Sequence, residues 1–314
     1  MSMTIGIDIS KDWLDVARHP APGGGMARFA NNASGHAALI VWLGELGGPA
    51  RIVFEATGAY HRALALALQA AGHPFRKVNP RQARRFAQAA GKLAKTDRLD
   101  AAMLARMGHV LELEPDQPQG EKQSDLNALS SARTALLKDI NALTARRQVA
   151  CHDLVLRQLD RRLATLEADL AEIDAALATL IAADAELRAR AAILVSIPGL
   201  GAVSAAAILA GLPELGSMGN RQAAALAGVA PITRSSGKRQ GHAFIAGGRA
   251  ALRRALYMPA LVATRFNPDL RATYERLLAA GKPKKLALVA VMRKLVVLAN
   301  ALLRDGRKWV PHNA

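Results

Sequence analysis

A long stretch without a single glycine or proline runs from Glu121 to Ile197 in the middle of this 314-residue chain. Because these two residue types are the ones that interrupt helices, their absence permits very long helices. The phase of the apolar pattern slips between Leu154 and Leu159, so we expect either one kinked helix or two helices folded together. Apolar residues recur at steps of three and four, the heptad pattern of a coiled coil, at Leu126, Leu129, Leu136, Ile140, Leu143, Leu159, Leu163, Leu166, Leu170, Ile173, Leu177 and Leu180.

This heptad segment, residues 121–190, would expose an apolar stripe unless another helix covers it. We therefore predict a coiled coil that joins two copies of the chain, with packing of the helices inside one chain as the alternative. Arg133 and Arg147 occupy seam positions, which indicates local interruptions of the apolar contact.

Positive charge is in large excess, with 42 Lys and Arg against 25 Asp and Glu and a formal net charge of +17. From Thr233 to the C-terminus there are 17 basic residues against three acidic ones, so this third carries +14 of the total. Such a balance favours a polyanionic partner, nucleic acid before a membrane surface. Aromatic residues make up only 4%, and the abundance of Ala and Leu favours helices over sheet.

Cysteine usage and hydropathy indicate a soluble, cytoplasmic protein. The single Cys151 excludes a disulfide framework and a cysteine-rich zinc site. No signal peptide is visible, and the apolar run 286–303 is broken by Arg293 and Lys294, so we expect no membrane span.

The N-terminal part alternates apolar runs with turn signals in the order of an RNase H-like fold: three strands, helix, strand, helix, strand. The expected elements are strands 3–9, 13–17 and 26–30, helix 34–46, strand 51–54, helix 60–71 and strand 75–78. We therefore expect an α/β domain first and all-helical parts after it.

Four acidic residues are candidate metal ligands. Asp8 and Glu55 end two of the expected strands, and Asp97 and Asp100 stand three apart at a helix start, on one helical face. Each has a simpler alternative, a turn cap or a helix cap. Together they could hold two divalent ions around a scissile phosphate, and Mg²⁺ suits an all-oxygen set. Asp12 and Asp15 are interpreted as surface groups.

Basic residues gather between Asn79 and Arg98, close to these acids in sequence. They could hold a nucleic-acid backbone or simply form a solvated helix face. They are Arg81, Arg84, Arg85, Lys92, Lys95 and Arg98.

Two motifs lie in the C-terminal part. Ile197–Gly201 has the Pro-Gly-x-Gly turn of a helix-hairpin-helix module, in which Gly199 and Gly201 would let backbone amides bind DNA phosphate; an ordinary helical turn is the alternative. In the second motif Ser236 precedes a glycine. It is a candidate nucleophile towards a phosphodiester, or part of a plain loop. Further phosphate-binding candidates are Arg234, Lys238, Arg239, Arg253 and Arg254, the last two on an expected helix 249–261.

In order, these motifs resemble the DEDD transposases of bacterial insertion sequences, the family numbered one hundred and ten, which includes the Piv-type DNA invertases. The resemblance rests on Gly6-Ile7-Asp8-Ile9-Ser10-Lys11, Phe54-Glu55-Ala56-Thr57-Gly58, Lys95-Thr96-Asp97-Arg98-Leu99-Asp100-Ala101, Ile197-Pro198-Gly199-Leu200-Gly201, Ala227-Gly228-Val229-Ala230-Pro231, Ser236-Gly237-Lys238 and Leu252-Arg253-Arg254-Ala255-Leu256. It covers essentially the whole chain.

The resemblance implies a RuvC-like catalytic domain over residues 1–115, a coiled-coil dimerisation segment over 121–190 and a C-terminal transposase domain over 191–314. It also implies Mg²⁺ at Asp8, Glu55, Asp97 and Asp100, and a covalent phosphoserine DNA intermediate on Ser236, with Ser235 as the adjacent alternative. A structured bridge RNA would pair with donor and target DNA. Dimers would assemble to a tetramer on DNA in the bacterial nucleoid, with one subunit's acids serving another's serine.

Two other functions agree with the residues alone. A RuvC-like nuclease would use water in place of the serine, and a non-catalytic nucleic-acid-binding scaffold would need only the basic C-terminal part and the hairpin module.

Overall fold

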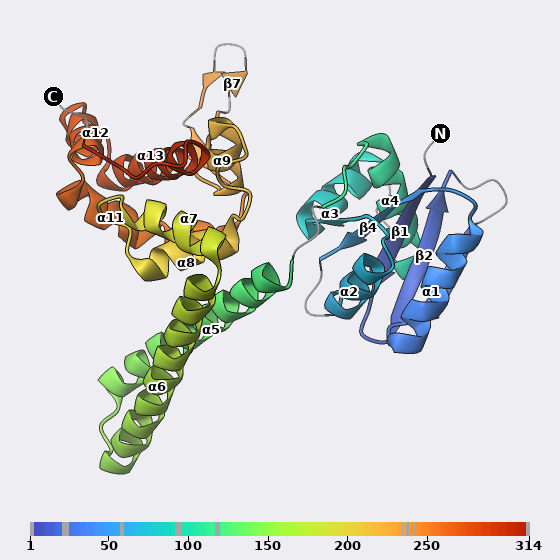
Figure 1. Cartoon of the computed structure of the whole chain (residues 1–314), viewed down its shortest axis with the longest axis horizontal. Helices are drawn as coiled ribbons and strands as arrows, with labels where there is room; N and C mark the ends of the chain where they lie inside the picture. Colours follow the sequence, from blue (N-terminus) through green and yellow to red (C-terminus); the bar gives the residue numbers. More distant parts are fainter. Residues whose placement is uncertain are drawn as a thin grey trace. The chain divides into compact units, whose positions relative to one another are not determined.

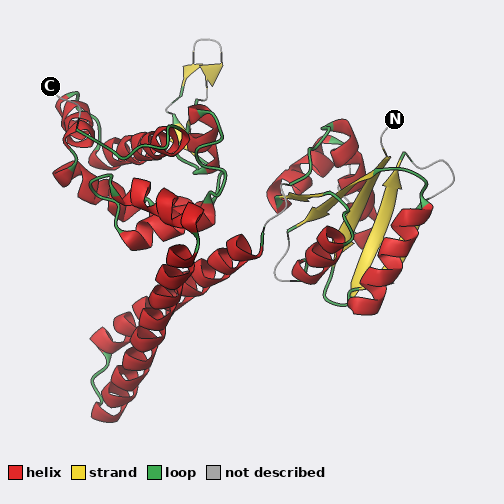
Figure 2. Ribbon diagram, viewed as in Figure 1, coloured by secondary structure: helices red, strands yellow, loops and turns green. Residues whose placement is uncertain are grey.

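The computed structural model describes residues 3–20, 25–56, 60–91, 96–116, 120–233, 235–236, 239–241 and 243–311. Its contacts divide the chain into two compact units, Met1–Pro118 and Gln119–Ala314 (Figures 1 and 2). The first unit is a sheet with helices on both faces, and the second contains long helices and short strands.

A five-stranded mixed sheet forms the centre of the first unit, in the order β3-β2-β1-β4-β5. The three N-terminal strands are antiparallel, whereas β1, β4 and β5 are parallel. This arrangement confirms the predicted order of elements, with bounds that agree within two residues. The strands are β1 (Met3–Ile9), β2 (Trp13–His19), β3 (Met26–Ala30), β4 (Ala50–Glu55) and β5 (Phe75–Val78).

Helices cover both faces of this sheet. On one face Ile5, Ile7 and Phe54 form a core with α1 (Ala33–Glu45) and α2 (Arg62–Ala70). On the other face α4 (Asp97–Val110) packs against β1, β2 and β4, with α3 (Pro80–Ala89) beside it.

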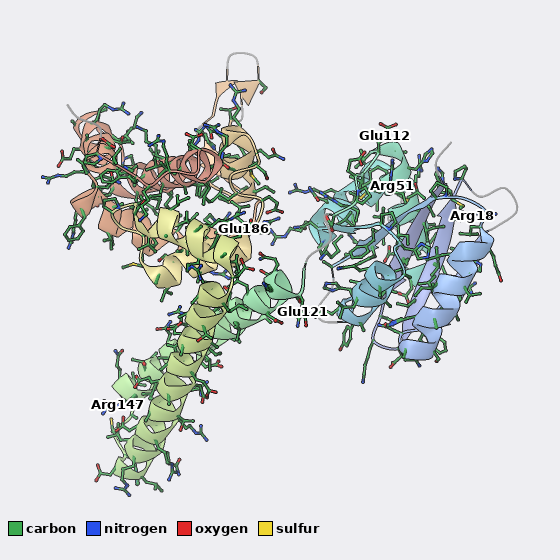
Figure 3. The ribbon with its side chains drawn as sticks, viewed as in Figure 1. Arg18, Arg51, Glu112, Glu121, Arg147 and Glu186 are labelled. Carbon is green, nitrogen blue, oxygen red and sulfur yellow. The ribbon has the colours of Figure 1, made fainter. Side chains whose placement is uncertain are left out.

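The heptad segment folds as two helices, α5 (Glu121–Val149) and α6 (Asp153–Ala183), which pack against each other inside one chain. Ion pairs join α5 to α6 and to the residue that follows it: Lys122 to Asp184 at 2.7 Å, Arg133 to Asp174 at 2.6 Å, and Arg147 to Asp160. Figure 3 labels Arg147, which lies in the last turn of α5. Each step forward in α5 is matched by a comparable step backward in α6, so the pair is antiparallel.

The break between these helices confirms the second of the two expected forms. The start of the second helix is marked by His152. The Nδ1 atom of this residue accepts a hydrogen bond from the Leu154 amide at 3.2 Å and so caps α6. At the two expected interruptions, Arg133 and Arg147, the guanidinium groups pair with aspartates of the opposite helix, so the helices stay joined there by ion pairs. Dimerisation through this segment stays a prediction.

The remaining helices of the second unit surround one apolar core. Among the described residues only the helix Lys284–Arg304 is long and apolar enough to cross a membrane, but half of its apolar stretch is buried in the protein, where it packs against other helices of this unit. The helices are α7 (Ala185–Val195), α8 (Ala202–Gly211), α9 (Asn220–Leu226), α10 (Ala250–Ala255), α11 (Tyr257–Phe266), α12 (Pro268–Ala279) and α13 (Lys284–Arg304).

Between α9 and α10 the chain forms a projecting β-finger, residues 231–245. At its base β6 (Pro231–Ile232) pairs with β9 (Phe244–Ile245), and at its tip β7 (Ser235–Ser236) pairs with β8 (Arg239–Gln240). In Figure 1 the tip stands away from the helices of the second unit. The sequence pattern predicts a loop here, and one helix over 249–261 where the structure has α10 and α11.

Candidate active site

An unusually close approach between α4 and the sheet organises the site. A Cβ atom on Gly6 of β1 would overlap the Ala101 carbonyl oxygen and the Ala105 amide of α4. The approach is similar at Thr4, two residues before Gly6 in β1: a Cβ atom on Gly108 of α4 would lie 2.8 Å from the Thr4 methyl carbon. Glycine is therefore required on both elements for this packing.

The same packing fixes the register between β1 and α4. Thr4, Gly6 and Asp8 lie on one face of the strand because side chains alternate. A two-residue step in a strand covers about 6.6 Å, which equals about four residues of a helix. Because Thr4 lies by Gly108 and Gly6 lies by Ala101, Asp8 faces the first turn of α4, which contains Asp97 and Asp100.

Glu55 joins this cluster from the neighbouring strand. The parallel register of β1 and β4 pairs Ile7 with Phe54, so Asp8 and Glu55 lie side by side at the carboxyl ends of their strands. Ligands are commonly held at this edge of a parallel sheet.

The electrostatics of Asp8 reflect these neighbours. Burial, followed by the negative charges of Asp100, Asp97, Glu55 and Asp15, raises the pKa of Asp8 from its ordinary 3.8 to about 6. The carboxylates are therefore close enough to repel one another. They form the negative cluster that a divalent cation would relieve.

The metal itself stays a prediction. Among the described residues, no group of three His, Cys, Asp or Glu side chains converges closely enough to hold an ion as it stands. The donor chemistry still fits, because β1, β4 and α4 contribute four carboxylates near the end of β1, and Mg²⁺ prefers oxygen ligands.

The helix-cap alternative for the two aspartates of α4 loses support. Thr96 is the N-cap residue, and its Oγ accepts a hydrogen bond from the Leu99 amide at 3.3 Å. Asp97 and Asp100 therefore occupy the first turn without capping it. Asp97 is exposed and Asp100 is half-buried.

Asp15 is not the surface group that the sequence analysis expected. Its side chain is buried because it lies directly opposite Asp8 in the β1–β2 pair, under α4. Arg28 of β3 compensates its charge through two hydrogen bonds, Nε to Oδ1 at 3.0 Å and Nη2 to Oδ2 at 2.9 Å. Asp12 is exposed, as expected.

The basic residues of α3 form one exposed face. Arg81, Arg84 and Arg85 follow a helical spacing and have accessible side chains, whereas Phe86 packs towards the sheet. Lys92 and Lys95 lie outside the described residues. The three arginines are accessible to a nucleic-acid backbone, and their binding role stays a prediction.

Ser236 is exposed at the tip of the β-finger. Arg239 lies opposite it in the β7–β8 register. Arg234, Gly237 and Lys238 lie outside the described residues. Ser236 is therefore accessible to solvent, and its role as a nucleophile stays a prediction.

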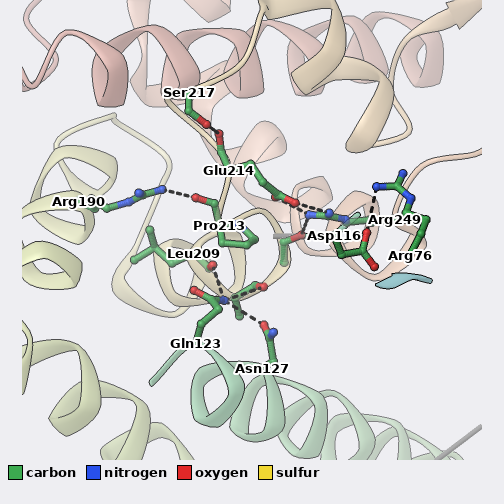
Figure 4. A network of polar contacts seen from close by, with 12 residues as sticks. Arg76, Asp116, Gln123, Asn127, Arg190, Leu209, Pro213, Glu214, Ser217 and Arg249 are labelled. Carbon is green, nitrogen blue, oxygen red and sulfur yellow. Dashed lines mark hydrogen bonds and ion pairs between the residues drawn. The ribbon is translucent and has the colours of Figure 1, made fainter. Parts of the chain in front are cut away.

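Two arginines at the start of α10 make structural contacts, and those of Arg253 flank the finger. The Arg253 Nη1 donates to the carbonyl oxygens of Gly247 at 2.8 Å and Gly228 at 3.3 Å. Arg249 donates to the Glu214 carboxylate at 2.7 and 2.9 Å (Figure 4). This structural use of Arg253 was missed by the sequence analysis, which assigned it to nucleic acid.

Arg254, the next residue along α10, is exposed. Its assignment to nucleic acid stays a prediction.

The turn over Ile197–Gly201 joins α7 to α8 as expected from its motif. Gly199 has φ +106°, and a Cβ atom there would lie 2.7 Å from that of Ala263 in α11. Gly201 is exposed at the N-terminus of α8. Phosphate binding at this turn stays a prediction.

Comparisons with known proteins agree with this arrangement. A family model described as "Transposase", for DEDD enzymes of IS110 elements, matches residues 5–151. A second, described as "Transposase IS116/IS110/IS902 family", matches residues 191–275. Pilin gene-inverting proteins of Moraxella lacunata and Moraxella bovis are each 30% identical to this chain over 320 residues, covering 98% of both sequences.

A third relative matches one part only. An uncharacterized 43.6 kDa protein of insertion element IS110 from Streptomyces coelicolor is 35% identical over 115 residues, 36% of this chain and 28% of that protein. These matches define a DNA transposase or site-specific recombinase. The chain belongs to the IS116/IS110/IS902 family of insertion-element transposases.

Proposed function

We propose that this transposase cuts and joins DNA strands with Asp8, Glu55, Asp97 and Asp100 as ligands of Mg²⁺ and Ser236 as the nucleophile. The observation that supports it most directly is the close packing of Gly6 on α4, which brings the carboxylates of three elements to the end of β1. When bound, the metal would polarise the scissile phosphate and stabilise charge on the leaving oxygen.

The serine step conserves one phosphodiester bond. The Ser236 hydroxyl loses its proton to solvent or a nearby base, and its Oγ bonds to phosphorus. The P–O bond to one deoxyribose breaks, and that sugar oxygen takes up a proton. A serine-linked phosphodiester therefore keeps the energy of the broken bond for rejoining.

The nucleophile and the acids belong to separate units of the chain. Ser236 stands on a finger whose tip is exposed, so it can reach an acid cluster that belongs to another copy. We propose dimers that exchange these groups, and a tetramer on DNA.

We further propose that a structured bridge RNA guides the protein by pairing with donor and target DNA. The net charge of +17 and the accessible arginines of α3 support contact with more than one nucleic-acid backbone. Mixing chain, DNA and RNA from the element's non-coding flank tests this, because recombination should require that RNA.

The catalytic proposal is tested by a covalent adduct between full-length protein and DNA that survives denaturant. The adduct should form with Mg²⁺ and disappear on chelation. It should also disappear in Ser236→Ala and in Asp8→Ala, whereas Ser217→Ala, which changes an exposed serine of the same unit, should retain it. An adduct that persists in Ser236→Ala but not in Ser235→Ala would move the nucleophile by one residue. Cleaved ends without any adduct would favour the nuclease that uses water.

A further inference from the structure

A row of charged residues crosses the sheet beside the candidate active site. Asp8, Asp15 and Arg28 are direct partners across β1, β2 and β3, so they lie on one face of the sheet. Glu55 extends the row on the other side of Asp8. The row therefore contains three carboxylates and ends in the guanidinium group of Arg28. The proposed chemistry gives this arginine no role.

The Arg28 guanidinium is held in a fixed orientation. Asp15 binds its Nε and Nη2 in a two-point geometry, and the group lies over the Trp13 ring, 5.5 Å from the ring centroid. Its side chain remains 45% exposed. Among the described residues its Nη1 amino group has no hydrogen-bond partner.

A second arginine faces the same space. Arg98, in the first turn of α4 between the two candidate ligands, lines a groove together with Arg28 and Asp15. The hydrogen bonds to Asp15, followed by the negative charges of Asp15 and Asp97, raise the pKa of Arg28. The groove is therefore lined by both arginines, and Arg98 is next to the candidate ligand Asp97 in the first turn of α4.

We propose that this groove is a DNA phosphate subsite, in which Arg28 and Arg98 bind a backbone phosphate next to the scissile one. The inference rests on the proposed active site at Asp8. Asp15 and Trp13 act as positioning residues that aim the Nη1 edge of Arg28 outward. A guanidinium that is already oriented loses little conformational entropy when it binds a phosphate oxygen.

The competing explanation is that Arg28 only neutralises the buried Asp15. Removing one partner of such a pair is destabilising in either case, because it leaves a buried charge without compensation. The double variant Asp15→Asn with Arg28→Ala distinguishes the two explanations, because it removes both charges of the pair. Stability should recover in that variant, and the phosphate contact should not.

The experiment measures binding of the full-length chain to a fluorescein-labelled duplex that carries one end of the insertion element, over a range of salt concentrations. The Ser236→Ala background and EDTA are used, so the result depends on neither the nucleophile nor the metal. Each phosphate contact contributes about 0.9 to the slope of log K against log salt.

We expect Arg28→Ala and Arg98→Ala each to lower this slope by about 0.9 and the affinity about tenfold. Arg28→Lys should keep the slope, because the positive charge remains. Arg62→Ala is the matched control, since this arginine lies on α2, which packs on the opposite face of the sheet.

The double variant shows whether Arg28 binds phosphate or only neutralises Asp15. A melting temperature that returns to the wild-type value while the slope stays low supports the subsite. Recovery of both, or an unchanged slope in Arg28→Ala and Arg98→Ala, overturns it. The adduct assay tests the serine and the acids separately, so failure of one proposal is distinguishable from failure of the other.

Discussion

Gly6 of β1 and Ala101 of α4 are packed so closely that a single methyl group on Gly6 would overlap the Ala101 carbonyl oxygen. This contact limits how far the end of β1 can lie from the first turn of α4. Asp8 therefore meets Asp97 and Asp100 only as long as residue 6 has no side chain.

Gly6→Ala should separate α4 from the sheet and destabilise the first unit by about 3 kcal/mol, because backbone atoms of a packed helix cannot yield as a flexible side chain can. With the aspartates of α4 further away, the pKa of Asp8 should also fall towards its ordinary value. Chemical denaturation measures the first effect, and carboxyl NMR titration measures the second.

Gly44→Ala serves as the matched control for this change. Gly44 lies in α1, and a methyl group added to it would have no other atom within 4 Å. Alanine there should raise stability by about 0.5 to 1 kcal/mol through its helix propensity. Equal effects of the two substitutions would contradict the packing argument.

Asp8→Asn should stabilise the metal-free protein above pH 6. The pKa of Asp8 is raised to about 6 in the folded state, so the folded state keeps a proton that the unfolded state releases above about pH 4. The free energy of unfolding of the wild type therefore falls between about pH 4 and 6 and stays lower above this window. Because Asp8 is only half-buried, solvent screening limits the gain to about 1 to 2 kcal/mol.

Thermal melts in EDTA at pH 4 and pH 7.5 measure this gain. It should be small at pH 4 and full at pH 7.5, while Asp12→Asn, which changes an exposed acid in the neighbouring turn, should have little effect at either pH. A gain that does not change with pH would contradict the raised pKa of Asp8.

Much of the first unit could be predicted from the sequence because local patterns determine it. The apolar run around Ile7 and the turn signals after each strand specify the order of the sheet, and Asp8 and Glu55 are placed at strand ends by that order alone. The contact of Gly6 with Ala101 could not be predicted, because it joins residues far apart in sequence that have no pattern in common.

Asp15 and Arg28 illustrate the same limit. Because side chains alternate along β2, Asp15 lies on the same face of the strand as Trp13. A residue in a turn would have no such fixed face, so this alternation was the signal that could have placed Asp15 inside the sheet. The burial of Asp15 depends on α4, which lies about eighty residues further along the sequence. The β-finger was missed because strands of two residues are too short for any periodicity to be recognised.

Arg253→Gln should loosen the base of the β-finger without unfolding the second unit. The side chain holds the carbonyl oxygens of Gly228 and Gly247, between which the finger leaves and rejoins the helices. Glutamine cannot reach both carbonyls with charged donors, so we expect proteolysis within residues 231–245 to become several times faster, in the absence of DNA.

Arg254→Gln is the control for this prediction, because its side chain is exposed on the same helix. It should leave proteolysis of the finger unchanged. If both variants weaken DNA binding equally and neither changes proteolysis, Arg253 acts on nucleic acid, as its sequence motif suggested.

Exchanging the charges of Arg133 and Asp174 tests whether α5 and α6 pair within one chain. The two side chains are joined by hydrogen bonds of 2.6 and 3.2 Å and are each only partly exposed. Arg133→Asp alone places two like charges together and should cost about 1 to 2 kcal/mol, and adding Asp174→Arg should recover most of that loss. Because the pair is intrachain, the recovered stability should not depend on protein concentration in denaturant titrations. Recovery only at high concentration, or in mixtures of the two single variants, would show instead that the helices pair between copies, as the heptad pattern first suggested.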